Sequence, residues 1–365
     1  MAEILGIGIS HYPPLSGHDD AMAGILRGRL QDPDVPAAAK DMRNWPAKMR
    51  EEWGDDDGVK GAAQHREDML KGLRKTRAAI DAFKPDIVLI WGDDQYENFK
   101  EDIVPPFCVL AYEDMVVHPW AHASESAMFS AKKDEWGSGR PNAWNETGKT
   151  SMALKLHREA AKHLASELLG ADFDVAYAYK PLHHPGLSHA FLNALLYLDY
   201  DRKGWPYPVL PFQINCYGRH VISYRGFISK LAERGRPLDP PSPSPKRCFD
   251  MGAAVGPILK ASPWRVALVA SSSWSHAFLC DKTWRMQPDI AADRLLYDAL
   301  VKGDYATWRN YPLVQIEDSG QQEVLNWFAL MGAMQALNQP CTWSDFVETY
   351  VFNSSKVAAI FEPKG

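Results

Sequence analysis

Histidines in this chain stand directly after apolar, β-branched runs, where they could bind a metal ion or move a proton. His11 follows the run from Ile4 to Ile9 and precedes Pro13 and Pro14, which cannot continue a central strand. In open α/β sheets, ligands bind beyond the carboxyl ends of the strands. The pattern therefore predicts a short buried strand that carries His11 into a loop at a binding site. A histidine that merely ends a strand fits the same pattern.

Polar clusters also follow three other predicted strands. These clusters are Asp94-Gln95-Tyr96-Glu97 after residues 86–91, His183-His184-Pro185-Gly186 after residues 173–179, and His276 after residues 264–270. Neutral imidazole and carboxylate groups, without a thiolate cluster, suit Fe(II), Mn(II) or Zn(II). If the fold brings these strand ends together, two histidines and one carboxylate would hold a divalent metal and leave positions open for oxygen and substrate.

Several other histidines have a structural explanation beside the functional one. His157 and His163 lie on a predicted helix over residues 151–169, where partial exposure to solvent accounts for them. His118 and His122 stand four residues apart in a polar loop, a spacing that a metal site can use but that a surface loop explains better. The histidine pair before Gly186 is different, because a glycine there lets the backbone approach a ligand closely.

Composition excludes several classes of protein. The 365 residues carry a net charge of −6 and no run of lysine or arginine, which argues against nucleic-acid binding. The five cysteines are scattered without a CxxC pair, so we expect reduced thiols and a cytoplasmic location rather than a disulfide framework or a cysteine zinc site. No apolar run approaches the length of a membrane span, and the N-terminus lacks a signal-type core, so we expect no membrane association and no export.

The apolar runs alternate with amphipathic ones, which predicts a mixed α/β sheet with helices on both faces and the site at the strand C-terminal ends. Strands are expected at 4–9, 86–91, 107–112, 173–179, 208–215, 264–270 and 357–361, and helices at 61–83, 151–169, 248–260, 290–300, 321–337 and 343–350. Pro211 places the strand 208–215 at an edge or a bend. Residues 113–150 are expected to form a long loop or lid, and residues 237–247 a proline-rich connector.

Taken in order, these stretches resemble the class III extradiol ring-cleavage dioxygenase superfamily, which includes the catalytic beta subunit of protocatechuate 4,5-dioxygenase. The resemblance is carried by ISHYPPL, VLIWGDDQYENF, HREAAKHLASELLGADFDVAYAYKPLHHPG, WRVALVASSSWSHAFL, and the closing pair GQQEVLNWFALMGAM and FNSSKVAAIFEP. Each motif alone is weakly specific, but five in the family's order cover nearly the whole chain. The resemblance implies a single catalytic domain of the beta-subunit type over residues 1–365.

The resemblance also implies roles for individual residues. His11 matches a histidine that binds iron, and His184 is best placed as the catalytic acid and base. His157 matches a further histidine of the family's pocket, and His189 or His157 would polarise oxygen or a substrate carboxylate.

One departure from the family pattern concerns the metal ligands. Gln95 stands where the family has its second iron histidine. The family's glutamate ligand is matched by Asp289 or Asp293, with Asp289 favoured, and His276 would compensate as it does in relatives that cleave dihydroxyphenylalanine. Three arrangements stay open: His11 with Gln95 and Asp289; His11 and His276 with a carboxylate; or no tightly bound metal.

The activity implied by the resemblance is extradiol opening of a catecholic or aminophenolic ring with O2. The implied cofactor is Fe(II), with Mn(II) or Zn(II) as alternatives, and the partners are a small aromatic substrate and O2. We also expect a homodimer, the commonest soluble assembly, with a small accessory subunit as a further option. The competing hypotheses are a zinc-dependent hydrolase-like enzyme and a catalytically reduced homologue that serves as a partner or ligand-binding subunit.

Overall fold

The computed structural model describes residues 2–120, 142–220 and 237–363. Within these residues, eight strands form one sheet in the order β6-β3-β7-β2-β8-β1-β10-β9. The strands are β1 (Ile4–Ile9), β2 (Ile87–Gly92), β3 (Phe107–Leu110), β6 (Ala176–Ala178), β7 (Val209–Ile214), β8 (Val266–Ser271), β9 (Trp343–Val347) and β10 (Lys356–Phe361). β4 (Met115–Val117) and β5 (Met152–Leu154) pair separately as an antiparallel ribbon.

The central strands β7, β2, β8 and β1 run parallel, whereas β10 and β9 at one side and the β3–β7 pair are antiparallel. The sheet is therefore mixed, which confirms the predicted fold class. All six residues of each of these four central strands are buried, as near-continuous apolar strands covered on both faces must be.

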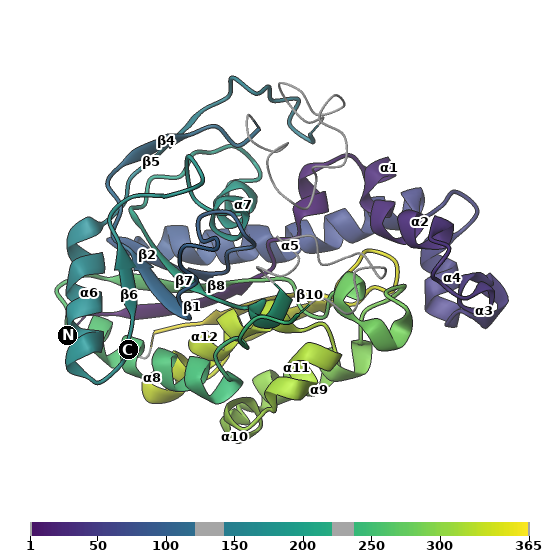
Figure 1. Ribbon diagram of the computed structural model, residues 1–365. Coiled ribbons are helices and arrows are strands. Elements are labelled where there is room, and N and C mark those ends of the chain that lie inside the picture. The colour runs from purple at the N-terminus through teal and green to yellow at the C-terminus, as the bar shows by residue number, and fades with distance from the viewer. Residues whose placement is uncertain (1, 121–141, 221–236, 364–365) are drawn as a thin grey trace.

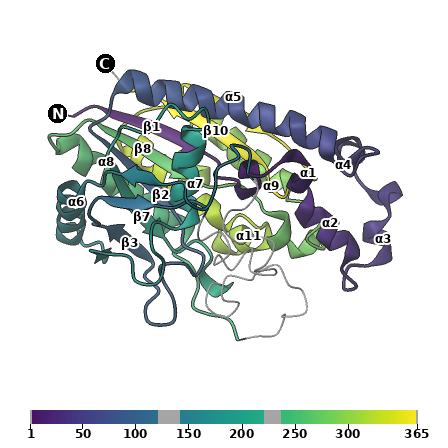
Figure 2. The ribbon, with the colours of Figure 1, turned by 90° about the horizontal axis from the view of Figure 1, so that it is seen from above.

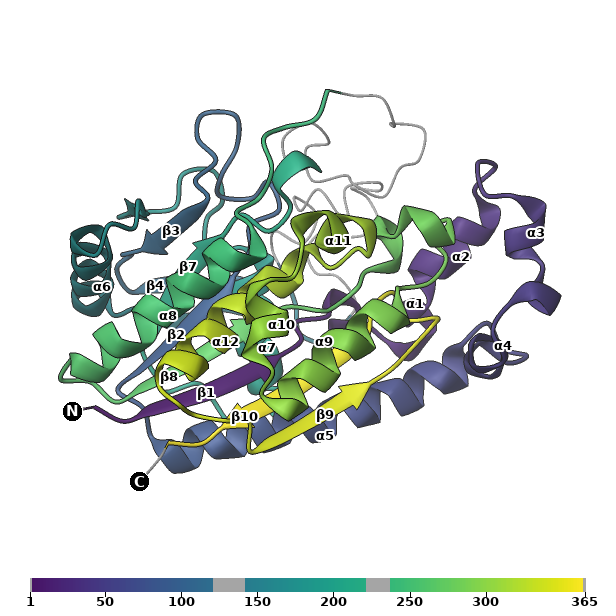
Figure 3. The same ribbon diagram turned by 90° about the horizontal axis from the view of Figure 1, so that it is seen from below.

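Helices cover both faces of the sheet (Figure 1). On one face, α5 (Val59–Phe83) packs on β1, β9 and β10, and α7 (His189–Leu198) packs on β2 and β8. On the other face, α12 (Leu325–Ala336) lies against β1, β2 and β8, with α8 (Pro245–Ala261) beside it and α6 (Arg158–Gly170) over β3 and β7. Figure 3 shows α8 and α12 side by side across this second face.

The remaining helices lie around this core. They are α1 (Asp19–Met22), α2 (Gly24–Gln31), α3 (Ala37–Lys40), α4 (Ala47–Trp53), α9 (Ile290–Lys302), α10 (Tyr305–Arg309) and α11 (Leu313–Asp318). Figure 2 shows α1 to α4 grouped at one end of the long helix α5. No helix of the described segments is long and apolar enough to cross a membrane.

Glycines in β1 allow α12 to lie directly on the sheet. A Cβ atom on Gly8 would lie 2.1 Å from the Trp327 ring of α12, and one on Gly6 would lie 2.4 Å from the Met334 sulfur. Contacts this short are not possible between real atoms, so only glycine fits without a shift of the Trp327 and Met334 side chains or of the helix itself. The alternating glycines of the first strand thus set the distance between the sheet and α12.

Some element boundaries differ from the sequence-based expectation. The predicted helix over 343–350 is wrong: residues 343–347 form β9, because Trp343–Val347 hydrogen bonds in register with β10 at the sheet edge. The helix expected from residue 151 begins only at Arg158, after β5. Pro211 lies in an interior strand, where it is tolerated because the pairing of β7 with β3 covers only Phe212–Ile214.

Two of the predicted loops are partly described. Of the expected lid at 113–150, residues 121–141, which include His122, lie outside the described residues. The proline-rich connector ends at Ser244 rather than at residue 247. Ser244 caps α8 by accepting a hydrogen bond from the Arg247 N–H, and Pro245 occupies the first helical position, where its missing N–H is not needed.

Substituting Gly8 by alanine tests whether α12 depends on this close approach. We expect Gly8→Ala to lower the free energy of unfolding by about 1–3 kcal/mol, the usual result of overpacking a core. Gly28→Ala is the matched control, because a Cβ atom there meets nothing within 4 Å, and alanine is about 1 kcal/mol better than glycine within a helix. Urea unfolding of both variants measures the difference. Equal stability of the two variants would contradict the expectation.

Candidate metal centre

Four side chains converge at the carboxyl ends of the central strands. His11, Asp93, His189 and Glu323 each offer one ligand atom, and these atoms all lie within 4.8 Å of one another. His11 follows β1, Asp93 follows β2, His189 begins α7, and Glu323 lies in the single turn before α12. β1 and β2 are separated only by β8, and all three run parallel, so their ends meet at one place.

The hydrogen bonds of His11 fix its tautomer. The Ser271 hydroxyl donates to the carbonyl oxygen of Ala190 at 2.9 Å, so its one proton is used. Ser271 Oγ must then accept from His11 Nδ1, 3.1 Å away. The lone pair of the neutral ring is therefore on Nε2, which is buried, has no hydrogen-bond partner and lies 3.4 Å from Glu323 Oε2. Burial lowers the pKa of His11 well below its usual value, which keeps this nitrogen available as a ligand.

His189 is oriented by a buried carboxylate. Glu97 accepts hydrogen bonds from the His189 backbone N–H at 2.9 Å and from Nδ1 at 2.8 Å. The opposite nitrogen, Nε2, is buried without a partner. Burial works against the charged ring, but Glu97 prevails and raises the pKa of His189 to about 10. A carboxylate behind the ring is the usual arrangement for a histidine that binds metal, since it fixes the ring and makes the other nitrogen more basic.

Asp93 and Glu323 bring two carboxyl groups into the same buried space. Glu323 accepts hydrogen bonds from the Tyr217 hydroxyl and from the Ser273 N–H at 3.1 Å, and Asp93 accepts one from Asn326 at 3.4 Å. Burial raises the pKa of Glu323 to about 7. Burial and the charge of Glu323 raise the pKa of Asp93 well above its usual value. If both carboxyl groups are to stay ionised, a cation must compensate their charge, either protonated His189 or a metal ion.

The donor set fits a divalent metal. His11 Nε2, His189 Nε2 and Asp93 Oδ2 are all buried polar atoms without a hydrogen-bond partner, and such atoms are rare unless something binds them. Two imidazole nitrogens and two carboxylate oxygens suit Fe(II), Mn(II) and Zn(II).

Not all of the predicted metal ligands lie in this group. His11 does. His276 lies outside the group but contacts one of its members, with its Nε2 3.3 Å from Glu323 Oε1. Burial, the largest effect, lowers the pKa of His276 to about 3, so its ring stays neutral. Gln95 is buried in the turn after β2, between the candidate ligand Asp93 and the supporting carboxylate Glu97. Asp289 is elsewhere: it caps α9 and forms an ion pair with Lys282 at 2.5 Å.

The three predicted catalytic histidines lie in different places in the structure. His189 belongs to the metal-binding group itself. His184 lies in the turn just before α7, where its Nδ1 accepts from the Gly186 N–H at 3.2 Å, and its charge acts on Glu97. His157 caps α6 and packs its ring 5.2 Å from the Trp264 ring. Its backbone N–H bonds to Val209 at the start of β7, so His157 lies at the opposite end of the strands.

Asp93 and Glu323 are the members of the group that the sequence reasoning did not select. Asp93 directly follows β2 and precedes Asp94 and Gln95 in the polar cluster that the sequence pattern points to. Glu323 lies within GQQEVLNWF, a carboxylate just before the apolar helical run that forms α12. Glutamate is rarely buried without a function or a partner, so its presence there was an available signal.

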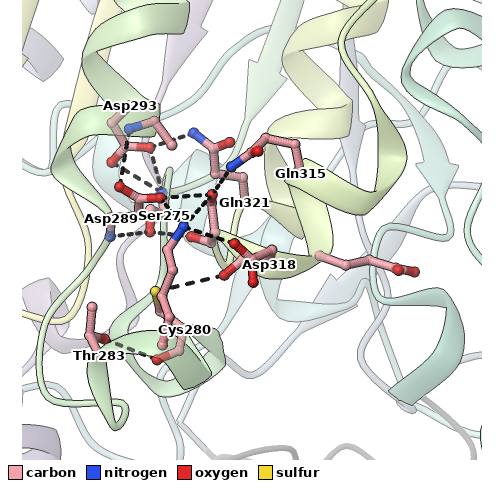
Figure 4. A network of polar contacts seen from close by, with 12 residues as sticks. Ser275, Cys280, Thr283, Asp289, Asp293, Gln315, Asp318 and Gln321 are labelled. Atoms are coloured by element: carbon pink, nitrogen blue, oxygen red, sulfur yellow. Dashed lines mark hydrogen bonds and ion pairs between the residues drawn. The ribbon is translucent and has the colours of Figure 1, made fainter.

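A second buried network holds Glu323 and His276 in place. Figure 4 shows Asp293 between Ser275 and Gln321. Its carboxylate accepts from the Ser275 N–H at 3.0 Å and from Gln321 Nε2 at 2.8 Å. Ser275 precedes His276, and Gln321 lies two residues before Glu323. Asp293, near Asp289 but not in the metal-binding group, therefore ties the loop after β8 to the turn before α12.

The role of Glu97 is tested by Glu97→Gln. We expect metal affinity to fall about 10- to 100-fold, the usual loss when the carboxylate behind a metal-bound histidine is removed. Calorimetric titration of the metal-free protein with Mn(II) measures the change. Glu167→Gln, on the exposed face of α6, is the control and should bind as the wild type does. An unchanged affinity in Glu97→Gln would exclude His189 as a ligand oriented by Glu97.

Asp293 should make stability depend on pH. Burial raises the pKa of Asp293 to about 7, so between pH 4 and pH 7 the native protein holds a proton that the unfolded chain has released. Stability from this group is complete below pH 4 and is lost as the pH rises towards 7, by at most about 1.4 kcal/mol per pH unit.

Asp293→Asn removes the titrating group and keeps a hydrogen-bond acceptor. The difference in unfolding free energy between wild type and Asp293→Asn should therefore shift in favour of the variant as the pH rises from 4 to 7. Chemical unfolding at several pH values measures it. Asp298→Asn, exposed on the same helix, should follow the wild type. A pH-independent difference would show that Asp293 is already ionised at pH 4.

Comparison with known proteins identifies distant relatives. No family model matches the chain. Curated proteins named 2,3-dihydroxyphenylpropionate/2,3-dihydroxicinnamic acid 1,2-dioxygenase do match: 26% identity over 206 residues in Comamonas testosteroni, and 27% over 233 residues in Burkholderia vietnamiensis. These alignments cover 56% and 63% of the chain, and 48% and 53% of the relatives. The chain thus spans about half the length of the curated relatives it matches.

A solved structure of an uncharacterized protein from Escherichia coli K12 aligns with 80% of the chain and 92% of that protein, at 14% identity and a TM-score of 0.41. That similarity is too low to support an argument. The matches to the curated dioxygenases confirm the resemblance to the class III extradiol ring-cleavage dioxygenase superfamily that the sequence motifs predict.

Proposed function

We propose that this protein is a non-haem metal-dependent dioxygenase that opens a catecholic ring by extradiol cleavage with O2, and that its metal is Fe(II). The observation that supports this most directly is the convergence of His11 Nε2, His189 Nε2 and Asp93 Oδ2, all buried and unpartnered, beside Glu323. His11, His189 and Glu323 would form the two-histidine, one-carboxylate set that leaves metal positions open for substrate and oxygen. Asp93 would be a fourth ligand, or it would accept a proton from one of the other ligands.

The metal, when bound, would lower the pKa of the substrate hydroxyls and bring substrate and O2 together. The protein's own side chains would supply the rest. His11 would be held as a neutral ligand by Ser271, and His189 by Glu97. Because both rings are fixed from behind by hydrogen bonds, the site is preorganised before substrate arrives.

His184 is the proposed acid and base. It is half-buried in the turn that leads into α7, and this turn is tied to the turn after β2 by a hydrogen bond from Asn98 to the Gly186 carbonyl at 3.1 Å. His184 also helps to lower the pKa of Glu97, the carboxylate that accepts from His189, and this proximity supports a role beside the candidate metal centre. There His184 would remove a proton from one substrate hydroxyl and return it later in the reaction.

An apolar cluster beside Glu323 suits an aromatic substrate. Tyr217, Phe278 and Leu279 form this cluster, and Ile25 and Tyr96 pack against it. Tyr217 donates to Glu323, and the Phe278 ring lies 5.2 Å from the ring of His276. Since the relatives are named for 2,3-dihydroxyphenylpropionate and 2,3-dihydroxicinnamic acid, the proposed substrate is a catechol with a short acidic side chain. A homodimer and a cytoplasmic location stay predictions.

The proposal is tested by anaerobic loading of the protein with Fe(II), followed by catechols and air. We expect a coloured ring-opened product, detected by its visible absorbance and by a mass gain of two oxygen atoms. Glu323→Gln should retain the fold and lose both tight Fe(II) binding and turnover. Glu317→Gln, which removes a half-buried carboxylate paired with Arg219, is the control and should be active. Absence of product from every diol or aminophenol, or zinc as the only metal retained, would favour the hydrolase-like alternative.

His184→Gln separates acid–base chemistry from metal binding. We expect kcat to fall by about 10²- to 10⁴-fold, the usual value of a positioned acid or base, with Fe(II) affinity unchanged. His183→Gln is the matched control, because His183 is exposed and pairs with Asp102 at 2.8 Å. Full activity in His184→Gln would exclude the assigned role.

A further inference from the structure

Arg29 of α2 is a buried arginine, and the Nε/Nη2 edge of its guanidinium group has no hydrogen-bond acceptor among the described residues. Only 6% of the residue is exposed. Its Nη1 donates to Asp32 at 2.6 Å, but Nε and Nη2 are buried without any hydrogen-bond partner. Guanidinium groups stay charged in proteins, and leaving buried donors of a charged group unpaired is costly. The arrangement therefore calls for an acceptor at the Nε/Nη2 edge.

The same edge holds carboxylates elsewhere in this protein. Nε and Nη2 together bind Asp41, Asp201, Glu348 and Asp250 through Arg43, Arg74, Arg294 and Arg309, respectively. Two parallel N–H donors match the two oxygens of a carboxylate, which is why this pairing recurs. Among these arginines, Arg29 is the one whose paired donors are buried and face no carboxylate of the described residues.

A second positive charge lies close to Arg29. Arg285 is 7% exposed and donates to Asp281 at 2.6 Å. Burial is the largest effect that lowers the pKa of Arg29, and Arg285 lowers it further, although Asp32 acts in the opposite direction. Two buried guanidinium groups near one another favour an anion between or beside them, because each repels the other.

We propose that the Nε/Nη2 edge of Arg29 is a binding site for a carboxylate ligand, with Arg285 adding to its positive potential. Ile25, one helical turn before Arg29, packs against the cluster of Tyr217, Phe278 and Leu279. Tyr217 in turn donates to Glu323. One apolar cluster therefore contacts both the helix that carries Arg29 and the candidate ligand Glu323.

Two sources could supply the carboxylate: the side chain of the aromatic substrate, or a separate small acid. The first source rests on the proposed dioxygenase function, whereas carboxylate binding at Arg29 does not. The two are distinguished by a binding experiment without metal and a kinetic experiment with metal.

The binding experiment uses metal-free protein and 3-phenylpropionate, which has the acid but no hydroxyls to chelate a metal. Calorimetric titration should show binding that is about 10- to 100-fold tighter than that of 3-phenylpropanamide, as expected for charge-assisted hydrogen bonds. Arg29→Met should abolish this preference, and Arg29→Lys should retain only part of it. Arg43→Met, which alters an exposed arginine already paired with Asp41, should behave as the wild type.

Equal binding of acid and amide by the wild type would overturn the proposal, and so would an unchanged preference in Arg29→Met. The wild-type comparison does not depend on any variant, so the test stands even if Arg29→Met fails to fold. Neither result depends on dioxygenase activity, so failure of the proposed function would be seen separately.

The kinetic experiment uses the Fe(II)-loaded protein with 2,3-dihydroxyphenylpropionate and with 3-propylcatechol, which lacks the acid. If the substrate supplies the carboxylate, Arg29→Met should raise KM about tenfold or more for the acid alone, with kcat little changed. If KM for the acid does not rise, the substrate does not supply the carboxylate that binds Arg29. A preference for the acid over the amide in the binding experiment would then identify a separate carboxylate ligand.

Discussion

The close approach of two buried carboxyl groups, Asp93 and Glu323, is the constraint on which the candidate site depends. Ionisation of both carboxyl groups is disfavoured there without a compensating cation, since burial raises the pKa of both and the charge of Glu323 raises that of Asp93 further. His189, whose pKa is raised to about 10, can supply that charge as a proton, and a divalent metal can supply it in exchange for the proton. The site is thus built so that metal binding and proton release are coupled.

The fold is shaped to make this approach possible. Glu323 and Asn326, which donates to Asp93, come from the turn before α12 and from α12 itself. That helix reaches the sheet only because Gly6 and Gly8 leave room for its side chains. The buried network of Asp293, Ser275 and Gln321 then fixes the turn that carries Glu323. The packing of α12 on its face of the sheet (Figure 3) and the position of Glu323 at the strand ends are therefore parts of one arrangement.

The proposed carboxylate site at Arg29 would add a second element of recognition. Diol binding at the metal would be shared by every catechol, so discrimination among catechols must come from contacts to the side chain. Arg29 has two buried donors without a partner in the described part of the chain, and its helix contacts the apolar cluster that also contacts Glu323, so it has the chemistry for such a contact. The proposed function and the proposed anion site would then together select an acidic catechol.

The local sequence pattern was sufficient to predict the central strands, the mixed sheet and the placement of His11 at a strand end. A buried strand and the prolines that end it are consecutive in the sequence, so no tertiary information is needed to find them. The pattern was not sufficient for β9, whose half-buried residues become a strand only through pairing with β10. For the same reason, the local sequence pattern did not predict the full set of candidate metal ligands. His189 and Glu323 lie 178 and 312 residues after His11 in the sequence, and only the tertiary structure brings them together with Asp93. The tertiary structure also decides that Asp289 caps a helix and that His157 lies at the opposite ends of the strands. Residue types and strand ends follow from the sequence, whereas the distances between side chains depend on how helices pack across the sheet.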